Sequence, residues 1–228
     1  MPVKLRDALQ LGRVGPSTGA ELLREGLWHR KTFLGLRCDL TRLPEVRPAR
    51  LALTMQPEPV ASFSGFEEEL RRSGGRDSVE LLLRIQSCES GVSTLYVARA
   101  EDGRPAYAQW LIRPQEQERL HAHAPGSYAP LGSDEVLLEG AYTFGEFRRL
   151  GLMADGMAQL LRYALAEGFR SAITYVATTN VASLRGCAAC GFEPDHLRIS
   201  ERRLGRRRSR PESLSPQARS AWAEALGL

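Results

Sequence analysis

The residues with the clearest chemical potential lie between an apolar run and a long amphipathic segment, at Arg148-Arg-Leu-Gly151-Leu-Met153. The apolar run starting at Glu135 predicts a strand, and the segment starting at Leu152 predicts a helix. The first N–H groups of a helix lack intrahelical partners, and the helix dipole adds about half a positive charge there. Gly151 would let a phosphate approach the backbone closely. The junction therefore predicts a pyrophosphate site.

Two other phosphate-binding motifs are absent from the chain. No G-x-x-x-x-G-K-S/T occurs, and the only lysines are Lys4 and Lys31. No G-x-G-x-x-G follows a predicted strand with an acidic residue about 20 positions later. These absences argue against a P-loop enzyme and against a dinucleotide-binding Rossmann domain.

The turn resembles the acyl-CoA signature of the GNAT superfamily of N-acyltransferases, in which Arg or Gln is followed by x-x-G-x and then Gly or Ala. Arg148, Gly151 and their spacing fit this pattern, and Phe147 supplies an aromatic residue before the arginine. Met153 stands where the family usually has a small residue. It would narrow the space beside the pyrophosphate.

A second stretch resembles the last helix of the same family, N-x-x-A/S-x-x-x-Y-x-x-x-G-F. Asn180 and the pair Gly191-Phe192 fit it, whereas Cys187 replaces the usual tyrosine. Asn is a favourable N-cap, and Gly191 has the place of a C′ glycine. Both motifs in this order, with a predicted helix and strand between them, extend the resemblance over residues 95–193.

The resemblance implies an acyl-CoA site, with acetyl-CoA or another short acyl-CoA as cosubstrate. The strand before the turn would pair with the pantetheine arm, and the amides of the turn would hold the pyrophosphate. The residues assigned to this site are Tyr142, Thr143, Phe144, Arg148, Arg149, Leu150, Gly151, Leu152, Met153, Asn180 and Ser183.

Direct attack of an amine on a thioester requires a base for the amine proton. Glu139 is the candidate, nine residues before Arg148, and strand alternation would place it on one face with Ala141 and Thr143. Pairing with an arginine on a solvated face is its alternative. Glu135 is the second candidate base, with an exposed position at the strand start as its alternative.

Cys187 is the candidate acid for the departing thiolate, although we favour a buried side chain packed on the sheet. A covalent acyl-cysteine intermediate at Cys187 would need a neighbouring base. Ser183, one helical turn earlier, cannot act as one. Cys187 and Cys190 supply two of the four ligands of a structural zinc site, so we predict no metal. His121 and His123 fall in a predicted polar loop. We favour a solvated pair, and a place near the acceptor site is the alternative.

Composition indicates an ordinary globular protein of 228 residues, 43% hydrophobic and 25% charged. No apolar run approaches the roughly 18 residues of a membrane span. The first residues lack the apolar region of a signal peptide, so we expect a cytoplasmic protein with reduced cysteines.

The net charge of +4 is concentrated in one segment, since residues 198–210 hold seven Arg and one Glu and leave −2 for the rest. We interpret six of these arginines as a solvated hairpin edge on which charge prevents strand pairing: Arg202, Arg203, Arg206, Arg207, Arg208 and Arg210. No aromatic residue is interleaved to stack on bases, which argues against nucleic acid. Attraction of the CoA 3′-phosphate or of an acidic acceptor is the other alternative.

The elements that must position these residues are consistent with an α+β fold. We expect strands at 32–40, 50–55, 95–100, 106–112 and 172–178, helices at 66–72, 78–86 and 152–167, and a loop at 113–133. The predicted segments are an N-terminal helical part (1–26), an acyltransferase domain (27–210) and a C-terminal helix (211–228). The resemblance implies a mixed, mainly antiparallel central sheet with flanking helices, splayed at the acyl-CoA site.

The function implied by the resemblance is N-acyl transfer, most simply N-acetyl transfer, to a small-molecule or protein amine. Two alternatives remain open. One is a GNAT-fold regulatory or interaction protein that binds acyl-CoA with weak catalysis, and the other is a longer-chain acyl synthase of similar fold. A homodimer is also left open.

Overall fold

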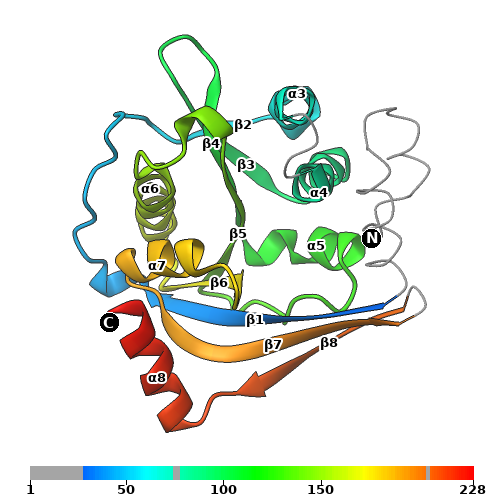
Figure 1. Cartoon of the computed structure of the whole chain (residues 1–228), viewed down its shortest axis with the longest axis vertical. Coiled ribbons are helices and arrows are strands. Elements are labelled where there is room, and N and C mark those ends of the chain that lie inside the picture. The colour runs from blue at the N-terminus through cyan, green and yellow to red at the C-terminus, as the bar shows by residue number, and fades with distance from the viewer. Residues whose placement is uncertain (1–27, 74–77, 204–205) are drawn as a thin grey trace.

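An eight-stranded sheet organises the chain in the computed structural model, which describes residues 28–73, 78–203 and 206–228 (Figure 1). The strand order is β2-β3-β4-β5-β6-β1-β7-β8. The strands are β1 (Trp28–Asp39), β2 (Gln56–Glu58), β3 (Thr94–Arg99), β4 (Pro105–Ile112), β5 (Glu135–Thr143), β6 (Ser171–Ala177), β7 (Glu193–Arg203) and β8 (Arg206–Ser213). The β5–β6 pair is parallel, and the other neighbours are antiparallel.

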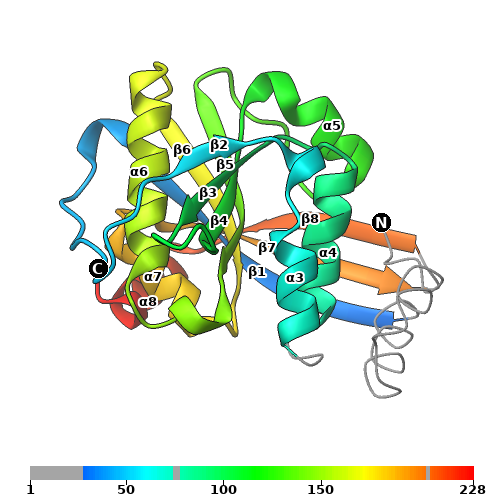
Figure 2. The ribbon, with the colours of Figure 1, turned by 90° about the horizontal axis from the view of Figure 1, so that it is seen from above.

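Helices cover both faces of this sheet. The helices are α3 (Gly65–Arg72), α4 (Ser78–Glu89), α5 (Gln117–His123), α6 (Leu152–Ala166), α7 (Val181–Ala189) and α8 (Pro216–Leu226), with short 3₁₀ turns η1 (Leu40–Arg42), η2 (Val60–Ser62), η3 (Pro114–Glu116) and η4 (Gly145–Phe147). Figure 2 shows α6 and α7 on one side of the sheet and α3, α4 and α5 on the other. Helix α8 packs against β7 and α7. The predicted α+β class is confirmed.

Strands β5 and β6 separate soon after they begin. They pair only over Glu135–Leu137 and Ser171–Ile173. Beyond these residues β5 continues beside β4, and β6 continues beside β1. The predicted splay of the central sheet is therefore present, and it opens towards the carboxyl ends of both strands.

Helix α6 lies along this splayed part of the sheet. Its apolar stripe is buried because Leu152, Met157, Leu160, Leu161 and Ala164 face the core. Its position is close to the sheet: a Cβ at Gly156 would lie 2.6 Å from Tyr107 Cδ1 of β4. The helix thus holds its N-terminal end near β5.

Two sequence predictions about the elements are wrong. Residues 50–55 are irregular chain rather than a strand, and α6 satisfies part of their backbone: Met55 N donates to Gln159 Oε1 at 3.0 Å. The predicted loop 113–133 contains η3 and α5.

The helices predicted at 66–72, 78–86 and 152–167 are present as α3, α4 and α6, and each of their ends lies within three residues of the predicted one. Strand β8 extends into the predicted C-terminal segment as far as Ser213, before α8 begins at Pro216. The predicted N-terminal segment, 1–26, lies outside the described residues.

Candidate functional site

The turn before α6 uses two residues with positive φ. Arg149 has φ 67°, and Gly151, the N-cap of α6, has φ 84° without a side-chain cap. Space around Gly151 is open, since a Cβ there would have Ala49 Cα as its nearest neighbour, at 3.5 Å. The first acidic residue of the helix is Asp155. The start of α6 therefore presents uncapped amides and the positive end of the helix dipole.

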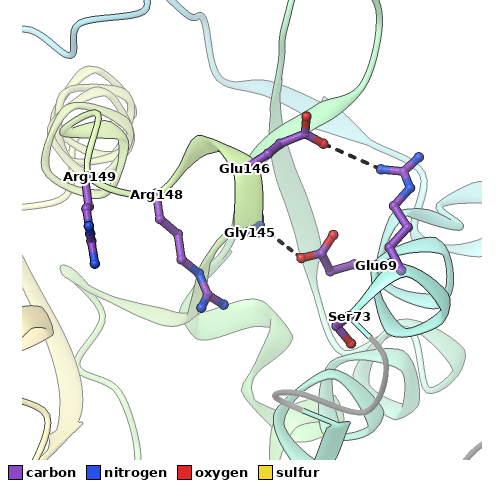
Figure 3. A pocket seen from close by; sticks show the side chains of 7 residues that line it. Glu69, Ser73, Gly145, Glu146, Arg148 and Arg149 are labelled. Carbon is purple, nitrogen blue, oxygen red and sulfur yellow. Dashed lines mark hydrogen bonds and ion pairs between the residues drawn. The ribbon is translucent and has the colours of Figure 1, made fainter.

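An open pocket of about 600 Å³ adjoins this turn, lined by Glu69, Arg72, Ser73, Gly145, Glu146, Arg148 and Arg149. Figure 3 shows Arg148 and Arg149 extending from the turn towards the same side. Both carboxylates of this pocket have partners. Glu69 Oε1 accepts the N–H of Gly145 at 2.9 Å, and Glu146 forms an ion pair with Arg72 at 3.8 Å. Three arginines against two glutamates leave this surface an excess of positive charge.

The register between β4 and β5 shifts at Gly140. Trp110 pairs with Glu139, whereas Ala108 pairs with Tyr142, so β5 holds one extra residue in a β-bulge. Gly140 has φ 67°, and a Cβ there would lie 2.5 Å from Trp110 Cε3. Only glycine fits this position without displacing the indole ring.

The bulge overturns the predicted alternation of β5. Directly opposed residues share a face, so Glu139 lies on the face of Tyr142 rather than with Ala141 and Thr143. Without the bulge, residues 139, 141 and 143 would share one face. The extra residue turns Glu139 towards the side of the sheet that α3 and α4 cover.

Arg84 of α4 holds the bulge in place. Its Nε donates to Gly140 O at 3.1 Å, and its second terminal nitrogen donates to Ala141 O at 2.8 Å. Glu80 pairs with the same guanidinium at 2.9 Å. Arg84 thus has backbone partners on β5 and a compensating charge in the exposed carboxylate of Glu80.

Two cavities meet at Glu139. The first, about 180 Å³ and named here the splay cavity, is lined from α4, β5, β6, α6 and α7. The second, about 240 Å³ and named the α4–α5 cavity, is lined from α4, α5, β1, β4 and β7. Arg84, Glu139 and Gly140 line both.

The Glu139 carboxylate is partly engaged. Its Oε1 accepts the N–H of Gly140 at 3.2 Å, whereas its Oε2 is buried without a hydrogen-bond partner. Within the described part of the chain Glu139 forms no ion pair, so the alternative of an arginine partner on a solvated face is not realised there. A buried carboxylate oxygen without a donor is a costly arrangement that a ligand donor would satisfy.

The second candidate base has a structural partner. Glu135 is 8% exposed and forms an ion pair with Arg37 of β1. The alternative of an exposed position at the strand start is wrong, because β5 and β6 are still paired at this point. Glu135 lines neither cavity.

Cys187 of α7 lines the splay cavity with its side chain 0% exposed. Burial raises the pKa of its thiol above the ordinary value, so the thiol keeps its proton. Met153 reaches the neighbouring turn of α7: its Sδ lies 3.2 Å from where a Cβ on Gly186 would be. Gly186 therefore provides space for the large residue that replaces the small one of the family pattern.

The remaining residues of the expected acyl-CoA site fall into three groups. Side chains of Tyr142, Phe144 and Leu152 are buried in the core. Thr143, Arg148, Arg149, Leu150 and Gly151 belong to the end of β5 and the turn, and Met153, Asn180 and Ser183 line the splay cavity. Asn180 Oδ1 accepts the Ser183 N–H at 3.1 Å, which caps α7 as predicted.

The two histidines of the predicted loop lie in α5. His123 lines the α4–α5 cavity, with its Nε2 3.2 Å from Ser87 Oγ, and burial lowers the pKa of its imidazole. His121 does not line that cavity. Of the two histidines, only His123 thus lines the α4–α5 cavity, which Glu139 also lines.

Sequence reasoning missed Gly140 and Arg198. An isolated glycine inside a strand pattern is a signal for a bulge, and it was available in the sequence. Arg198 gave no separate signal within the Arg-rich segment, although the predicted hairpin is present as β7 and β8.

No family model matches the chain, and a search of curated proteins finds no match. Among solved structures, a GNAT-family acetyltransferase from Colwellia psychrerythraea superposes with a TM-score of 0.51 at 16% identity, over 86% of this chain and 61% of that chain. A glucosamine N-acetyltransferase region of a fungal multi-domain β-N-acetylglucosaminidase gives a TM-score of 0.50 at 15% identity. The match covers 82% of this chain and 22% of that chain. At such identities the likeness shows the fold alone. The chain has the fold of the GNAT acetyltransferases and spans about three fifths of the length of the Colwellia protein.

Two further observations concern membranes and metals. None of the helices in the described ranges has both the length and the apolar character needed to cross a bilayer. Among the same residues, no group of three or more His, Cys, Asp and Glu side chains is arranged to hold a metal ion.

Proposed function

We propose that this chain is an acyl-CoA-dependent N-acyltransferase, most simply an N-acetyltransferase, which transfers the acyl group directly to an amine. The observation that carries the proposal is the place of Glu139, where the splay cavity and the α4–α5 cavity meet. Its buried, unpartnered Oε2 is suited to accept a proton from an amine in either cavity.

The donor side of the proposed site fits an acyl-CoA. Uncapped amides at Gly151 and the start of α6, with Arg148 and Arg149 beside them, would hold the pyrophosphate. The part of β5 that β6 leaves unpaired would receive the pantetheine arm. When bound, an acyl-CoA would supply a thioester carbonyl and a thiolate leaving group.

The residues at the bulge have distinct roles in the proposed reaction. Glu139 accepts one proton from the amine nitrogen as the amide forms, and the departing thiolate takes up a proton from the site or from solvent. Arg84 fixes the carbonyls of Gly140 and Ala141, which sets the direction of the bulge amides. Gly140 and Ala141 line the splay cavity, and the Ala141 N–H, in the peptide whose carbonyl Arg84 holds, is the proposed donor to the acyl oxygen.

The test uses Glu139→Gln, which keeps the shape of the side chain and removes the base. With acetyl-CoA and a panel of primary amines, release of free CoA should fall about 100-fold or more, while CoA affinity measured by calorimetry is retained. Glu89→Gln, an exposed position on α4, is the matched control and should keep wild-type turnover.

Two results would contradict the proposal. Near-wild-type turnover in Glu139→Gln would remove this residue from the base role. Binding of CoA by the wild type without amine-dependent release from any donor would instead support the regulatory alternative.

A further inference from the structure

Arg198 of β7 is a buried cation that lines the α4–α5 cavity. The residue is 6% exposed and lines the cavity. One terminal nitrogen of its guanidinium donates to Ser127 O at 2.7 Å. Its Nε is buried without a hydrogen-bond partner. The guanidinium lies over three rings, with centroids at 4.5 Å for Phe33, 4.9 Å for Tyr128 and 4.0 Å for Tyr175.

Arg198 differs from Arg84 and Arg37 because no carboxylate pairs with it. Arg84 pairs with Glu80, and Arg37 pairs with Glu135. In the ranges that the structure describes, no carboxylate oxygen lies within 4.0 Å of the Arg198 guanidinium. Cation–π contacts offset part of the desolvation of this charge, but they leave the in-plane Nε–H unsatisfied. An anion in the cavity would neutralise the charge of Arg198 and accept a hydrogen bond from its Nε–H.

Two other polar groups of the same cavity also lack partners. Trp110 Nε1 is a buried donor, and Glu139 Oε2 is a buried acceptor. Trp110 Nε1 and Arg198 Nε are thus unused donors beside this cavity, and Glu139 Oε2 is an unused acceptor. The apolar side chains that line it include Leu83, Val92, Ile112 and Leu120.

We propose that the acyl acceptor is a small amphipathic amine that carries a carboxylate, such as an amino acid with an apolar side chain. The carboxylate binds Arg198, with Trp110 as a further donor, and the amine faces Glu139. The apolar part packs against the aliphatic lining. A volume of about 240 Å³ suits a metabolite-sized molecule. This inference rests on the proposed acyl transfer and names its acceptor class.

Arg198 is then a specificity residue, not a participant in bond making. The amine nitrogen bonds to the acyl carbon while the carbon–sulfur bond breaks, one amine proton passes to Glu139, and the thiolate takes up a proton. Arg198 holds the far end of the acceptor during this exchange. Its removal should therefore raise KM for the acid more than it lowers kcat.

The first experiment needs only the wild-type protein. With acetyl-CoA as donor, kcat/KM is measured for L-leucine and L-phenylalanine, for their amides, and for 2-phenylethylamine. The acids should exceed their amides by about 100-fold, because a site with buried donors rejects a ligand that leaves them unpaired. Equal rates for acid and amide, or a preference for the amides, would overturn the inference and leave N-acyl transfer intact. Absence of transfer to any amine would contradict the proposed function itself.

The second experiment changes the cation. In Arg198→Gln the acid-to-amide ratio of kcat/KM should fall from about 100 to near one, and Arg198→Lys should restore part of it. Arg208→Gln, the same change at an exposed position on β8, is the control and should keep the wild-type ratio. If Arg198 acts only by packing on its three rings, every variant that folds will keep the wild-type ratio, which would refute the assignment. If Arg198→Gln fails to fold, the wild-type comparison still decides.

Discussion

Cys187 shows how burial limits the chemistry of one residue. It stands where the family pattern has a tyrosine, and it lines the splay cavity, but its side chain is 0% exposed. Burial raises the pKa of the thiol, which makes both a thiolate nucleophile and rapid proton donation unfavourable. Packing on the sheet is the role that these facts favour, and it can be separated from catalysis by small substitutions.

We predict that Cys187→Ala lowers the free energy of unfolding by about 1 kcal/mol, because it leaves a small cavity. Acyl transfer should stay within a few-fold of wild type, since no group that handles the reacting atoms is removed. Chemical denaturation and steady-state rates check both parts. An acyl adduct mapped to Cys187 by intact-protein mass spectrometry, forming and decaying at the catalytic rate, would refute the packing role.

At the scale of elements, α6 has a left-handed glycine at each end. Gly151 precedes its first turn with φ 84°, and Gly168 follows its last turn with φ 96°. A Cβ would meet no atom within 4 Å at Gly168 and only Ala49 Cα, at 3.5 Å, at Gly151. The two positions therefore differ little in backbone strain and much in their distance from the proposed pyrophosphate site, which makes them a matched pair.

We predict that Gly151→Val and Gly168→Val both lower Tm in the absence of ligand, because a left-handed β-branched residue costs about 1–2 kcal/mol. Only Gly151→Val should also lose the rise in Tm that CoA produces, since its side chain would stand among the amides at the start of α6. Thermal unfolding with and without CoA checks this. A full CoA response in Gly151→Val would contradict the placement of the pyrophosphate.

How far the sequence predicts these elements depends on the range of the interactions involved. The stripe of α6, the Asn180 cap and the separation of β5 from β6 follow from local patterns or from the family resemblance. Residues 50–55 have a strand-like composition, but no strand pairs with them. The bulge at Gly140 and the unpaired charge of Arg198 depend on contacts with distant strands, which no single segment encodes.

At the scale of the whole molecule, the splayed sheet brings two separate cavities to one carboxylate. The splay cavity is lined by α6 and α7 and reaches Glu80 and Arg84 of α4, whereas the α4–α5 cavity is lined by α4 and α5 and by no residue of α6 or α7. Their common lining is Arg84, Glu139 and Gly140. In the proposed reaction, the acyl donor and the amine would therefore bind in different cavities at the same time.

This arrangement predicts a ternary complex before the acyl group is transferred. Initial rates measured over a grid of acetyl-CoA and amine concentrations should give intersecting double-reciprocal lines, and the donor alone should leave the mass of the protein unchanged. The reason is that the amine would reach the thioester directly from the α4–α5 cavity, while Cys187, which lines the splay cavity, is buried and its pKa is raised by burial. Product inhibition supplies the control: free CoA should compete with acetyl-CoA and not with the amine. Parallel lines with a covalent acyl-protein would contradict the two-cavity arrangement and require an intermediate on the chain.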